Sequence, residues 1–325
     1  MKIIVTGAGG FIGSALCRRL SSYNKVIGVD HRIGSDNNKD IVWEKTDLTD
    51  SEAVSKVIEK HSPDVIIHCA AIAHQKAGAI DYAAYMRVNS EATANLAEMA
   101  AKHNPDVKFI FLSSISVYGE EGLSQPVSES SPYNPTSDYA ASKVEAEKRL
   151  IALNDSGVLK DLIILRLAPV YDSDWTFNID KRVLLPKKIA YVRFGPGEQQ
   201  ISALARPNLV DFIGHILNIP SDCLKLNLRI INVCDSQPYT FNQIIEIFKK
   251  SHRCPKRLVV FIPLFFVFVL TRIGGLLMPS KKSWIHSCYD KLASSLVFDN
   301  KAMLETGFVP PYSLETVLTS KVGSV

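Results

Sequence analysis

The stretch Lys2-Ile-Ile-Val-Thr-Gly-Ala-Gly-Gly-Phe-Ile-Gly13 begins with an apolar run and continues into glycines three residues apart. A short continuous run of Ile and Val predicts a strand that is covered on both faces, and helical periodicity follows Gly13. Gly7, Gly10 and Gly13 therefore stand in a turn between a strand and a helix. Glycine permits the tight turn and lets the backbone approach a pyrophosphate, which the helix N-terminus attracts.

The same alternation of strand and helix continues through the first half of the chain. Further strands are expected at Lys25–Val29, Ile41–Lys45, Val65–Cys69, Lys108–Leu112 and Leu162–Leu167. Helices are expected at Phe11–Ser22, Ser51–Lys60, Tyr85–His103 and Tyr139–Leu153. This order predicts an α/β fold with a Rossmann-type, doubly wound parallel sheet.

The alternation becomes irregular after about residue 170. We expect a hairpin-like piece at Ala190–Ser202 and a further strand at Arg229–Cys234. Residues 1–170, with part of 203–235, are therefore predicted to form the dinucleotide-binding domain. Residues 171–325 are predicted to form a smaller, interleaved C-terminal substrate lobe.

Composition and charge exclude several classes of protein. The chain of 325 residues is 46% hydrophobic and 22% charged, which excludes a disordered or repetitive protein. Its 37 basic and 33 acidic residues are too balanced to indicate a nucleic-acid partner. Six cysteines without a C-x-x-C pair indicate neither a metal site nor a disulfide scaffold, so we expect a reduced, cytoplasmic protein.

One apolar segment, Val259–Leu270, raises the question of a membrane. It has twelve residues and is interrupted by Pro263, so it is shorter than the roughly 20 residues of a spanning helix. We predict no transmembrane span and favour a buried helix. The alternative is weak contact with a membrane surface through Phe261–Leu277, because Arg272, Lys281 and Lys282 can meet anionic head groups.

An acidic residue, Asp30, follows the second strand, 23 residues after Gly7. A carboxylate at this place hydrogen-bonds a ribose 2′-hydroxyl and repels a 2′-phosphate. NAD is therefore the predicted cofactor, with NADP less favoured, although the neighbouring Arg32 softens that preference.

Polar residues that suit proton transfer follow the fifth strand and begin a later helix. Tyr139 and Lys143 are one helical turn apart on one face, and an ammonium at this distance is expected to lower the pKa of the phenol. Ser114 stands at the C-terminal end of a strand, where open α/β sheets bind ligands. Its hydroxyl can polarise a carbonyl or alcohol while the tyrosine moves the proton.

Together these motifs resemble the extended short-chain dehydrogenases/reductases of the nucleotide-sugar epimerase/dehydratase type. The resemblance rests on T-G-x-x-G-x-x-G at Thr6–Gly13, on Asp30, and on the spacing of 25 residues from Ser114 to Tyr139. It also rests on Asp47-Leu48, His68-x-Ala-Ala71, Asn89, S-S-x-x-V-Y-G at Ser113–Gly119 and Y-x-x-x-K at Tyr139–Lys143.

The resemblance implies roles for individual residues. Ser114 and Tyr139 would relay a proton, Lys143 would bind the nicotinamide ribose, and a sugar carbon, typically C4, would give up a hydride. His68 would be a structural or near-cofactor histidine rather than a base, because Tyr139 fills that role. The residues implied in cofactor binding are Gly7, Gly10, Phe11, Ile12, Gly13, Asp30, Asp47, Leu48, Ala70, Asn89, Tyr139 and Lys143. A homodimer paired through Thr93–His103 and Tyr139–Leu153 is also implied.

The substrate end departs from the family pattern in two places. Asp172 replaces a glycine, and Ile201 stands where relatives place a phosphate-binding arginine. Arg206 or Arg193 is expected to supply that charge, since losing a charge-assisted phosphate bond costs about 1.5–3 kcal/mol. The residues implied in binding a nucleotide sugar are Ser114, Ser116, Asn178, Arg206 and Lys291.

Three functions fit the motifs. The first is an NAD-dependent epimerase acting at C4 of a UDP-glucose or UDP-N-acetylglucosamine type of substrate, through a 4-keto intermediate. The second is an NAD(P)H-dependent reductase of a UDP-4-keto-6-deoxy-hexosamine, because Phe261–Leu277 and the segment Ser295–Asp299 resemble such enzymes. The third is a non-catalytic NAD-binding module. A 4,6-dehydratase is disfavoured, because Ile115 and Ser116 replace its Asp-Glu pair.

Overall fold

The computed structural model describes residues 1–32, 38–73, 80–119, 126–219, 229–251, 257–278, 285, 289 and 292–319. The chain forms two compact units, each built from separate segments. Unit 1 consists of Met1–Gly119, Pro132–Arg166 and Ile213–Ile231. Unit 2 consists of Glu120–Ser131, Leu167–Phe212 and Asn232–Val325.

A seven-stranded sheet has the order β11-β6-β5-β4-β1-β2-β3. Its strands are β1 (Lys2–Thr6), β2 (Lys25–Asp30), β3 (Ile41–Lys45), β4 (Val65–His68), β5 (Lys108–Ser114), β6 (Asp161–Leu167) and β11 (Ile230–Val233). The pairs β1–β2, β2–β3, β1–β4 and β4–β5 are parallel. The predicted doubly wound parallel sheet is confirmed, and its chain order reverses between β1 and β4, which is where such folds bind ligands.

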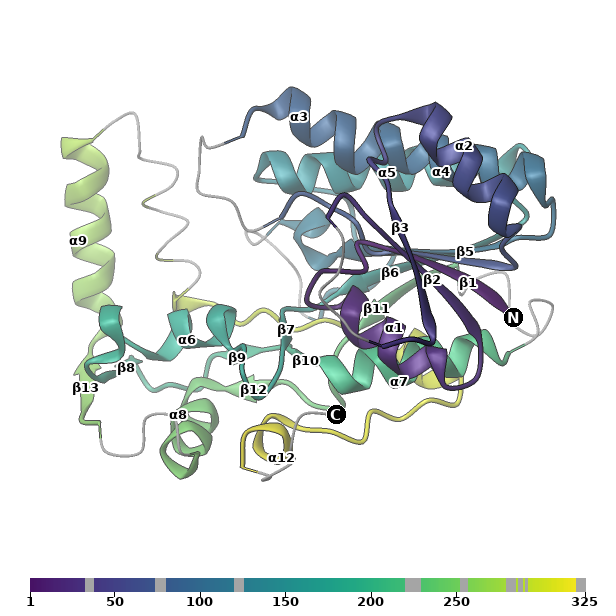
Figure 1. Cartoon of the computed structure of the whole chain (residues 1–325). Coiled ribbons are helices and arrows are strands. Elements are labelled where there is room, and N and C mark those ends of the chain that lie inside the picture. Colours follow the sequence, from purple (N-terminus) through teal and green to yellow (C-terminus); the bar gives the residue numbers. More distant parts are fainter. Residues whose placement is uncertain are drawn as a thin grey trace. The chain divides into compact units, whose positions relative to one another are not determined.

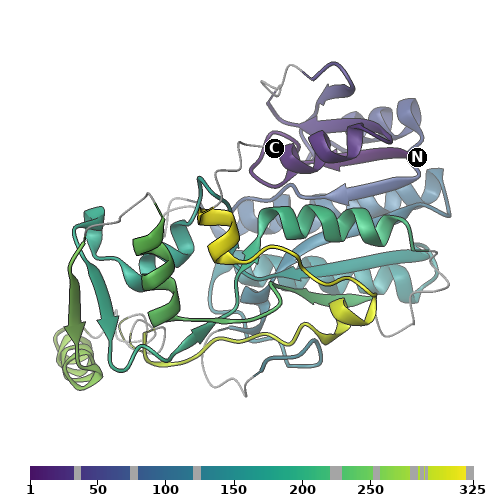
Figure 2. The ribbon, with the colours of Figure 1, turned by 90° about the horizontal axis from the view of Figure 1, so that it is seen from below.

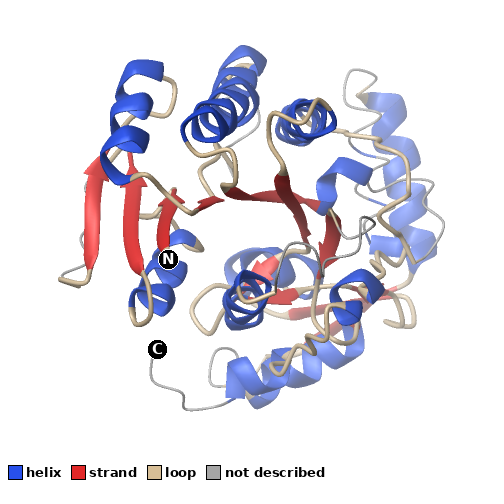
Figure 3. Ribbon diagram, turned by 90° about the vertical axis from the view of Figure 1, so that its right-hand side faces the viewer, coloured by secondary structure: helices blue, strands red, loops and turns tan. Residues whose placement is uncertain are grey.

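Helices cover both faces of this sheet (Figures 1 and 3). Figure 1 shows α2 (Ser51–His61), α4 (Ala92–His103) and α5 (Asp138–Asp155) on one face and α1 (Gly13–Ser21) on the other. The helix expected at Tyr85–His103 begins earlier, with α3 (Tyr82–Met86), and passes through a π-helical turn, η1 (Arg87–Glu91), before α4. Such turns often occur at functional positions.

The core of unit 1 lies between the sheet and α2, α4 and α5. Ile4, Ile66 and Phe109 from neighbouring strands are at most 1% exposed and belong to one apolar cluster with Leu96 and Leu150 from the helices. Burying each such side chain contributes about 1.5–3 kcal/mol. This packing holds the C-terminal ends of the strands at one edge.

Unit 2 contains short strands that pair two by two. They are β7 (Val170–Tyr171) with β10 (Leu204–Ala205), β8 (Tyr191–Phe194) with β13 (Val259–Ile262), and β9 (Gln200–Ile201) with β12 (Tyr239–Thr240). The hairpin expected at Ala190–Ser202 is therefore wrong, because β8 and β9 pair with strands from later in the chain. The described helical segments of unit 2 are α6 (Phe177–Val183), η3 (Pro186–Lys188), α8 (Phe241–Lys250), α9 (Leu264–Leu277), α11 (Lys301–Glu305) and α12 (Leu314–Thr319), and α7 (Arg206–Leu217) belongs to both units.

A buried carboxylate, Asp235, organises the interior of unit 2. It accepts hydrogen bonds from the hydroxyls of Tyr171 at 2.7 Å and Tyr239 at 2.9 Å. The amide of Asn208 and the backbone N–H of Ala205 donate to its other oxygen at 2.7 and 2.8 Å. Burial raises the pKa of Asp235, and these four donors oppose that shift.

The apolar segment near Val259 does not form a buried helix, so that expectation is wrong. It forms β13 and, after Pro263, the helix α9, whose side chains are largely exposed. In Figure 1 this helix extends away from the other labelled elements of unit 2, and Figure 2 shows the same helix nearly end-on. Within the described segments, every helix falls short of the length and apolar character needed to cross a bilayer.

Candidate active site

The loop between β1 and α1 is shaped by its glycines. Gly7 has a φ of +65°, which other residues rarely adopt, and a Cβ there would lie 2.8 Å from the backbone of Ala70. A Cβ on Gly13 would collide with the carbonyl oxygen of Gly7, and the N–H of Gly10 donates to that oxygen at 2.9 Å. Without side chains at these positions, the backbone and the N-terminus of α1 suit an approaching pyrophosphate.

Asp30, the last residue of β2, is held against this loop. One carboxylate oxygen accepts the N–H of Gly9 at 3.0 Å, and the other accepts the N–H of Arg32 at 3.1 Å. His31 Nδ1 lies 3.0 Å from the second oxygen. The carboxylate is therefore fixed beside the glycine turn, where the ribose of a dinucleotide lies in this type of fold.

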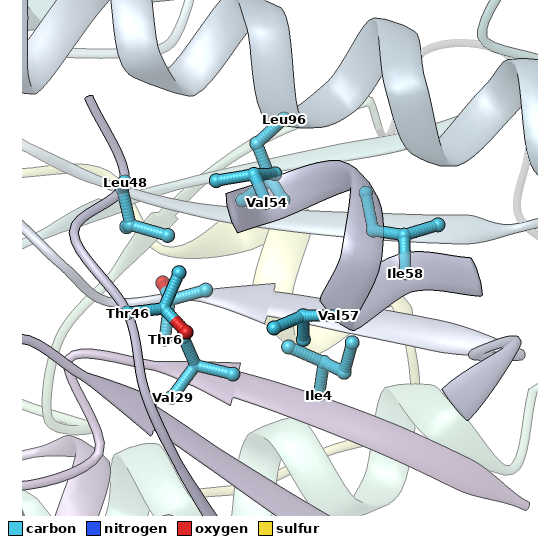
Figure 4. Close-up of a pocket in the computed structure, with 9 residues that line it drawn as sticks. All are labelled: Ile4, Thr6, Val29, Thr46, Leu48, Val54, Val57, Ile58 and Leu96. Carbon is cyan, nitrogen blue, oxygen red and sulfur yellow. The ribbon is translucent and has the colours of Figure 1, made fainter. Parts of the chain in front are cut away.

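Asp47 and Leu48 follow β3. Asp47 accepts the N–H and the hydroxyl of Thr49 at 2.9 and 2.8 Å, and these bonds hold the pKa of its carboxyl below the ordinary value. The side chain of Leu48 points into a small, largely apolar pocket between the sheet and α2 (Figure 4). The pocket is lined by Ile4, Thr6, Val29, Thr46, Leu48, Val54, Val57, Ile58 and Leu96. Leu48 thus anchors this turn by packing.

His68, at the end of β4, is completely buried between two threonines. Thr93 donates its hydroxyl to the carbonyl of Asn89 at 2.8 Å, so it accepts the proton on His68 Nε2, also at 2.8 Å. Nδ1 then accepts the hydroxyl of Thr6 at 2.7 Å. Burial lowers the pKa of His68 to about 3. The ring is therefore neutral, and both of its nitrogens are bonded to threonine hydroxyls.

Asn89, in the π-helical turn, is fully buried and bonded to protein groups. Its amide accepts the N–H of Ile72 at 2.7 Å and donates to the carbonyl of Ile72 and the hydroxyl of Ser142, both at 3.0 Å. It therefore ties the segment after β4 to α5. Both N–H donors of the amide are used in these bonds, so we propose that Asn89, which the resemblance implied in cofactor binding, positions the cofactor loop.

Ser114 ends β5 and caps the short 3-10 helix η2 (Ile115–Tyr118). Its Oγ accepts the N–H of Ser116 at 3.2 Å and the hydroxyl of Ser116 at 3.0 Å. The two serines expected at the substrate therefore lie together at the C-terminal end of a central strand, where ligands bind in this type of sheet.

Tyr139 and Lys143 lie one turn apart at the start of α5, which Ser137 caps. Burial raises the pKa of Tyr139 to about 12, and a side-chain hydrogen bond with Ser114 opposes the rise. Burial also lowers the pKa of Lys143 to about 8. Its Nζ donates to the carbonyl of Leu112 at 2.7 Å and lies 4.5 Å from the ring centre of Phe111. The expected lowering of the tyrosine pKa is thus not seen, because burial outweighs the other effects.

A buried ionic network behind these residues was missed at the level of the sequence. Glu147, one turn after Lys143 on α5, pairs with Arg166 on β6, with Nη2 and Oε2 2.6 Å apart. Its carboxylate also accepts the hydroxyls of Ser113 and Tyr133. Spacing along the helix places Glu147 on the face of Tyr139 and Lys143, which is the signal that could have revealed it.

The residues expected at the substrate come from both units. In unit 2, Arg206 forms an ion pair with Asp172, so the arginine expected to replace the missing charge is paired with one of the two departures from the family pattern. Ile201 is 6% exposed inside an apolar cluster, which explains why no arginine stands there. Arg193 lies over the ring of Phe261 at 5.2 Å. The side chain of Asn178 and the whole of Lys291 lie outside the described residues.

Comparisons with known proteins agree with this geometry. A family model described as "NAD dependent epimerase/dehydratase family" matches residues 3–201. A UDP-glucose 4-epimerase of Vibrio cholerae is 33% identical over 227 residues, which are 67% of this chain and 67% of the relative. A dTDP-glucose 4,6-dehydratase of Haemophilus influenzae is 35% identical over 44% of this chain, and the match spans only about half of that relative (48%).

The fold has solved counterparts over nearly its whole length. The structure of UDP-glucuronic acid 4-epimerase from Bacillus cereus, in complex with UDP-glucuronic acid and NAD, has a TM-score of 0.70 and 25% identity. The match covers 98% of this chain and 96% of the Bacillus cereus chain. Family membership also confirms the expectations of an enzyme and of NAD as its cofactor. This chain belongs to the NAD-dependent epimerase/dehydratase family.

Proposed function

We propose that this protein is an NAD-dependent epimerase that acts at C4 of a nucleotide sugar of the UDP-glucose or UDP-N-acetylglucosamine type. The observation that carries the proposal is the placement of Ser114 at the end of β5, close enough to Tyr139 to act on the pKa of its phenol, with Lys143 one turn further along α5. These residues share the C-terminal edge of the sheet with the glycine loop after β1. A sugar hydroxyl and a cofactor would therefore meet at this edge.

The residues divide the chemistry in a simple way. NAD, when bound, supplies the hydride acceptor and donor for C4. Tyr139 would take the proton of the C4 hydroxyl as a phenolate and later return it, which requires Lys143 and the bound cofactor to lower its pKa from about 12, while the Ser114 hydroxyl donates to the sugar oxygen. Lys143, already buried beside Leu112, binds the nicotinamide ribose and brings a positive charge near the phenol. The 4-keto sugar would then rotate in the site, so that the hydride returns to the opposite face of C4 and yields the epimer.

The NAD site is proposed to use three places on unit 1. The backbone of Gly7 to Gly13 faces the pyrophosphate, Asp30 bonds the adenosine ribose, and Asp47 with Leu48 borders the adenine. Phe11, Ile12 and Ala70 complete the lining, with Asn89 behind it. The fit rests on the missing side chains of the loop and on the fixed carboxylate of Asp30.

The same residues bear on the alternative functions. The 4,6-dehydratases need acidic side chains directly after β5, whereas this chain has a buried Ile115 and a Ser116 bonded to Ser114. An NAD(P)H-dependent reductase of a UDP-4-keto-6-deoxy-hexosamine stays a candidate, because α9 forms where the sequence resembles those reductases. The intact Ser114, Tyr139 and Lys143 argue against a non-catalytic NAD-binding module. The homodimer and the cytoplasmic location stay predictions.

The test is to incubate the purified protein with UDP-N-acetylglucosamine and a trace of NAD, and to follow the anomeric proton by NMR. A signal of the 4-epimer, absent with Tyr139→Phe, is the expected result. No epimer, together with stoichiometric NADH consumption on a 4-keto-6-deoxy nucleotide sugar, would overturn the epimerase in favour of the reductase.

A further inference from the structure

The helix α9 presents apolar side chains to solvent. Phe265 is 69% exposed, and Leu276 and Leu277 are both 77% exposed. Seven apolar side chains of this helix are at least 39% exposed, and we call them together the apolar face of α9. They are Phe265, Phe266, Phe268, Leu270, Ile273, Leu276 and Leu277. Apolar surface gathered in this way marks an interaction site, because water contact with it is unfavourable.

The other side of α9 accounts for how the helix is held in unit 2. Leu264, Val267 and Thr271 are partly buried, and Gly275 is buried, which is the spacing of one helical face. Gly274 lies against Ile285 on this side, and Phe268, at the border between this side and the apolar face, packs edge-on to Tyr289 with ring centres 5.5 Å apart. Because this side is already packed, the apolar face on the opposite side needs another explanation.

The neighbouring helix α8 shows the ordinary arrangement. Its buried face carries Ile244 and Phe248, while Lys249 and Lys250 pair with acidic residues at the surface. A surface helix of this kind has polar residues toward water. In α9 the outward positions hold Phe and Leu instead, and Arg272 is the one charged residue of the helix.

The apolar surface continues into β13. Val259, Val260 and Phe261, on the strand directly before α9, are 39–52% exposed. Leu258, just before the strand, is 83% exposed. The exposed apolar residues therefore come from one continuous stretch, residues 258–278, and from two adjoining elements.

The charge of this region indicates what the apolar face meets. Residues 251–289 contain six Lys and Arg and no Asp or Glu. They are Arg253, Lys256, Arg257, Arg272, Lys281 and Lys282. Arg272 lies on α9 itself, with its guanidinium 4.9 Å from the ring centre of Phe268. An apolar helix within a purely cationic stretch is complementary to a surface that offers acyl chains below anionic head groups.

We propose that the apolar face of α9 docks this protein on an anionic lipid bilayer, with the helix lying in the interface. With 14 residues the helix is about 21 Å long, too short for the roughly 30 Å of hydrocarbon. A second copy of the chain suits the face less well, because a two-fold axis would bring two cationic stretches together. The bilayer supplies the opposite charge.

The experiment is sedimentation of the full-length protein with vesicles of phosphatidylcholine containing one quarter phosphatidylglycerol. We expect the protein to pellet with these vesicles, to bind phosphatidylcholine alone about tenfold less, and to be partly released by salt. The triple variant Phe265→Gln, Leu276→Gln, Leu277→Gln should lose at least about tenfold in vesicle affinity. Arg272→Gln should lower binding only to the anionic vesicles.

Val309→Gln is the matched control, because Val309 is 68% exposed in unit 2 and lies outside the stretch. All variants should bind NAD as the wild type does, which shows that they are folded. Wild-type protein that stays in the supernatant with both kinds of vesicle would overturn the proposal. So would concentration-dependent dimers that the triple variant abolishes while vesicle binding is absent, since the face would then bind a second copy.

Discussion

Glu147 and Arg166 form an ion pair whose side chains are 0% and 2% exposed, with Nη2 and Oε2 2.6 Å apart. The guanidinium also donates to the hydroxyls of Tyr118 at 2.7 Å and Tyr133 at 3.0 Å. Glu147 lies on α5 and Arg166 on β6, so the pair joins the helix of Tyr139 and Lys143 to the sheet. Because the polar groups of this network have hydrogen-bond partners, the network can hold α5 against the sheet while both charges stay buried.

Removing one charge of this pair is expected to be costly. Glu147→Gln leaves the guanidinium of Arg166 buried with weaker partners, and the free energy of unfolding should fall by about 3–5 kcal/mol. Urea unfolding measures the change. The control is Glu145→Gln on the same helix, whose exposed pair with Arg149 should contribute at most about 1 kcal/mol. Equal effects of the two substitutions would contradict the structural role given to the buried pair.

Tyr139→Phe tests the proton relay. The substitution keeps the ring and removes the hydroxyl that meets Ser114, so turnover should fall by about 10²–10⁴ while NAD affinity stays within about threefold. Turnover is followed by NMR on the sugar and NAD affinity by calorimetry. Tyr23→Phe, at a tyrosine that is 80% exposed, should leave both unchanged. Wild-type turnover in Tyr139→Phe would remove the tyrosine from the mechanism.

Lys143 is expected to make stability depend on pH in the cofactor-free protein. Burial lowers its pKa from 10.5 to about 8. Between these values the unfolded chain binds more protons than the folded one, so the free energy of unfolding rises with pH through this window. Lys143→Met removes the cost of the buried charge and should be more stable than the wild type at pH 7, by about 1–3 kcal/mol. The difference should close as the pH approaches 10.5.

Urea unfolding of both proteins between pH 7 and 10.5 measures this difference. Lys148→Met, at an exposed position of the same helix, should stay within about 0.5 kcal/mol of the wild type at each pH. A wild type that is more stable than Lys143→Met at pH 7 would show that the partners of the ammonium outweigh its burial.

The sheet and the glycine loop could be predicted from the sequence, whereas the pairs that fix the site could not. Most sheet strands are apolar runs buried on both faces, with the edge strand β3 more exposed, and Gly7 and Gly13 must be small for steric reasons. Glu147 and Arg166 are 19 residues apart on different elements, so only the tertiary structure brings them together. The burial of α9 was predicted wrongly, because an apolar run does not tell whether protein or another apolar phase covers it.

The ion pair of Arg206 and Asp172 leads to the last prediction. If Arg206 binds the diphosphate of the substrate, Asp172 competes for the same guanidinium. Asp172→Asn removes the competing charge at nearly constant size, and the KM for the nucleotide sugar should fall several-fold with kcat unchanged. Arg206→Gln should raise KM by about tenfold or more, since a charge-assisted bond contributes about 1.5–3 kcal/mol.

The double variant Asp172→Asn, Arg206→Gln tests whether Arg206 binds the diphosphate. Once Arg206→Gln is present, Asp172→Asn should no longer change KM, because its effect acts through the guanidinium. Steady-state kinetics of the four proteins give the coupling between the two positions. If instead the two substitutions change KM independently, Asp172 acts on the substrate by another route. If Arg206→Gln leaves KM at the wild-type value, Arg206 does not replace the arginine that is absent at Ile201.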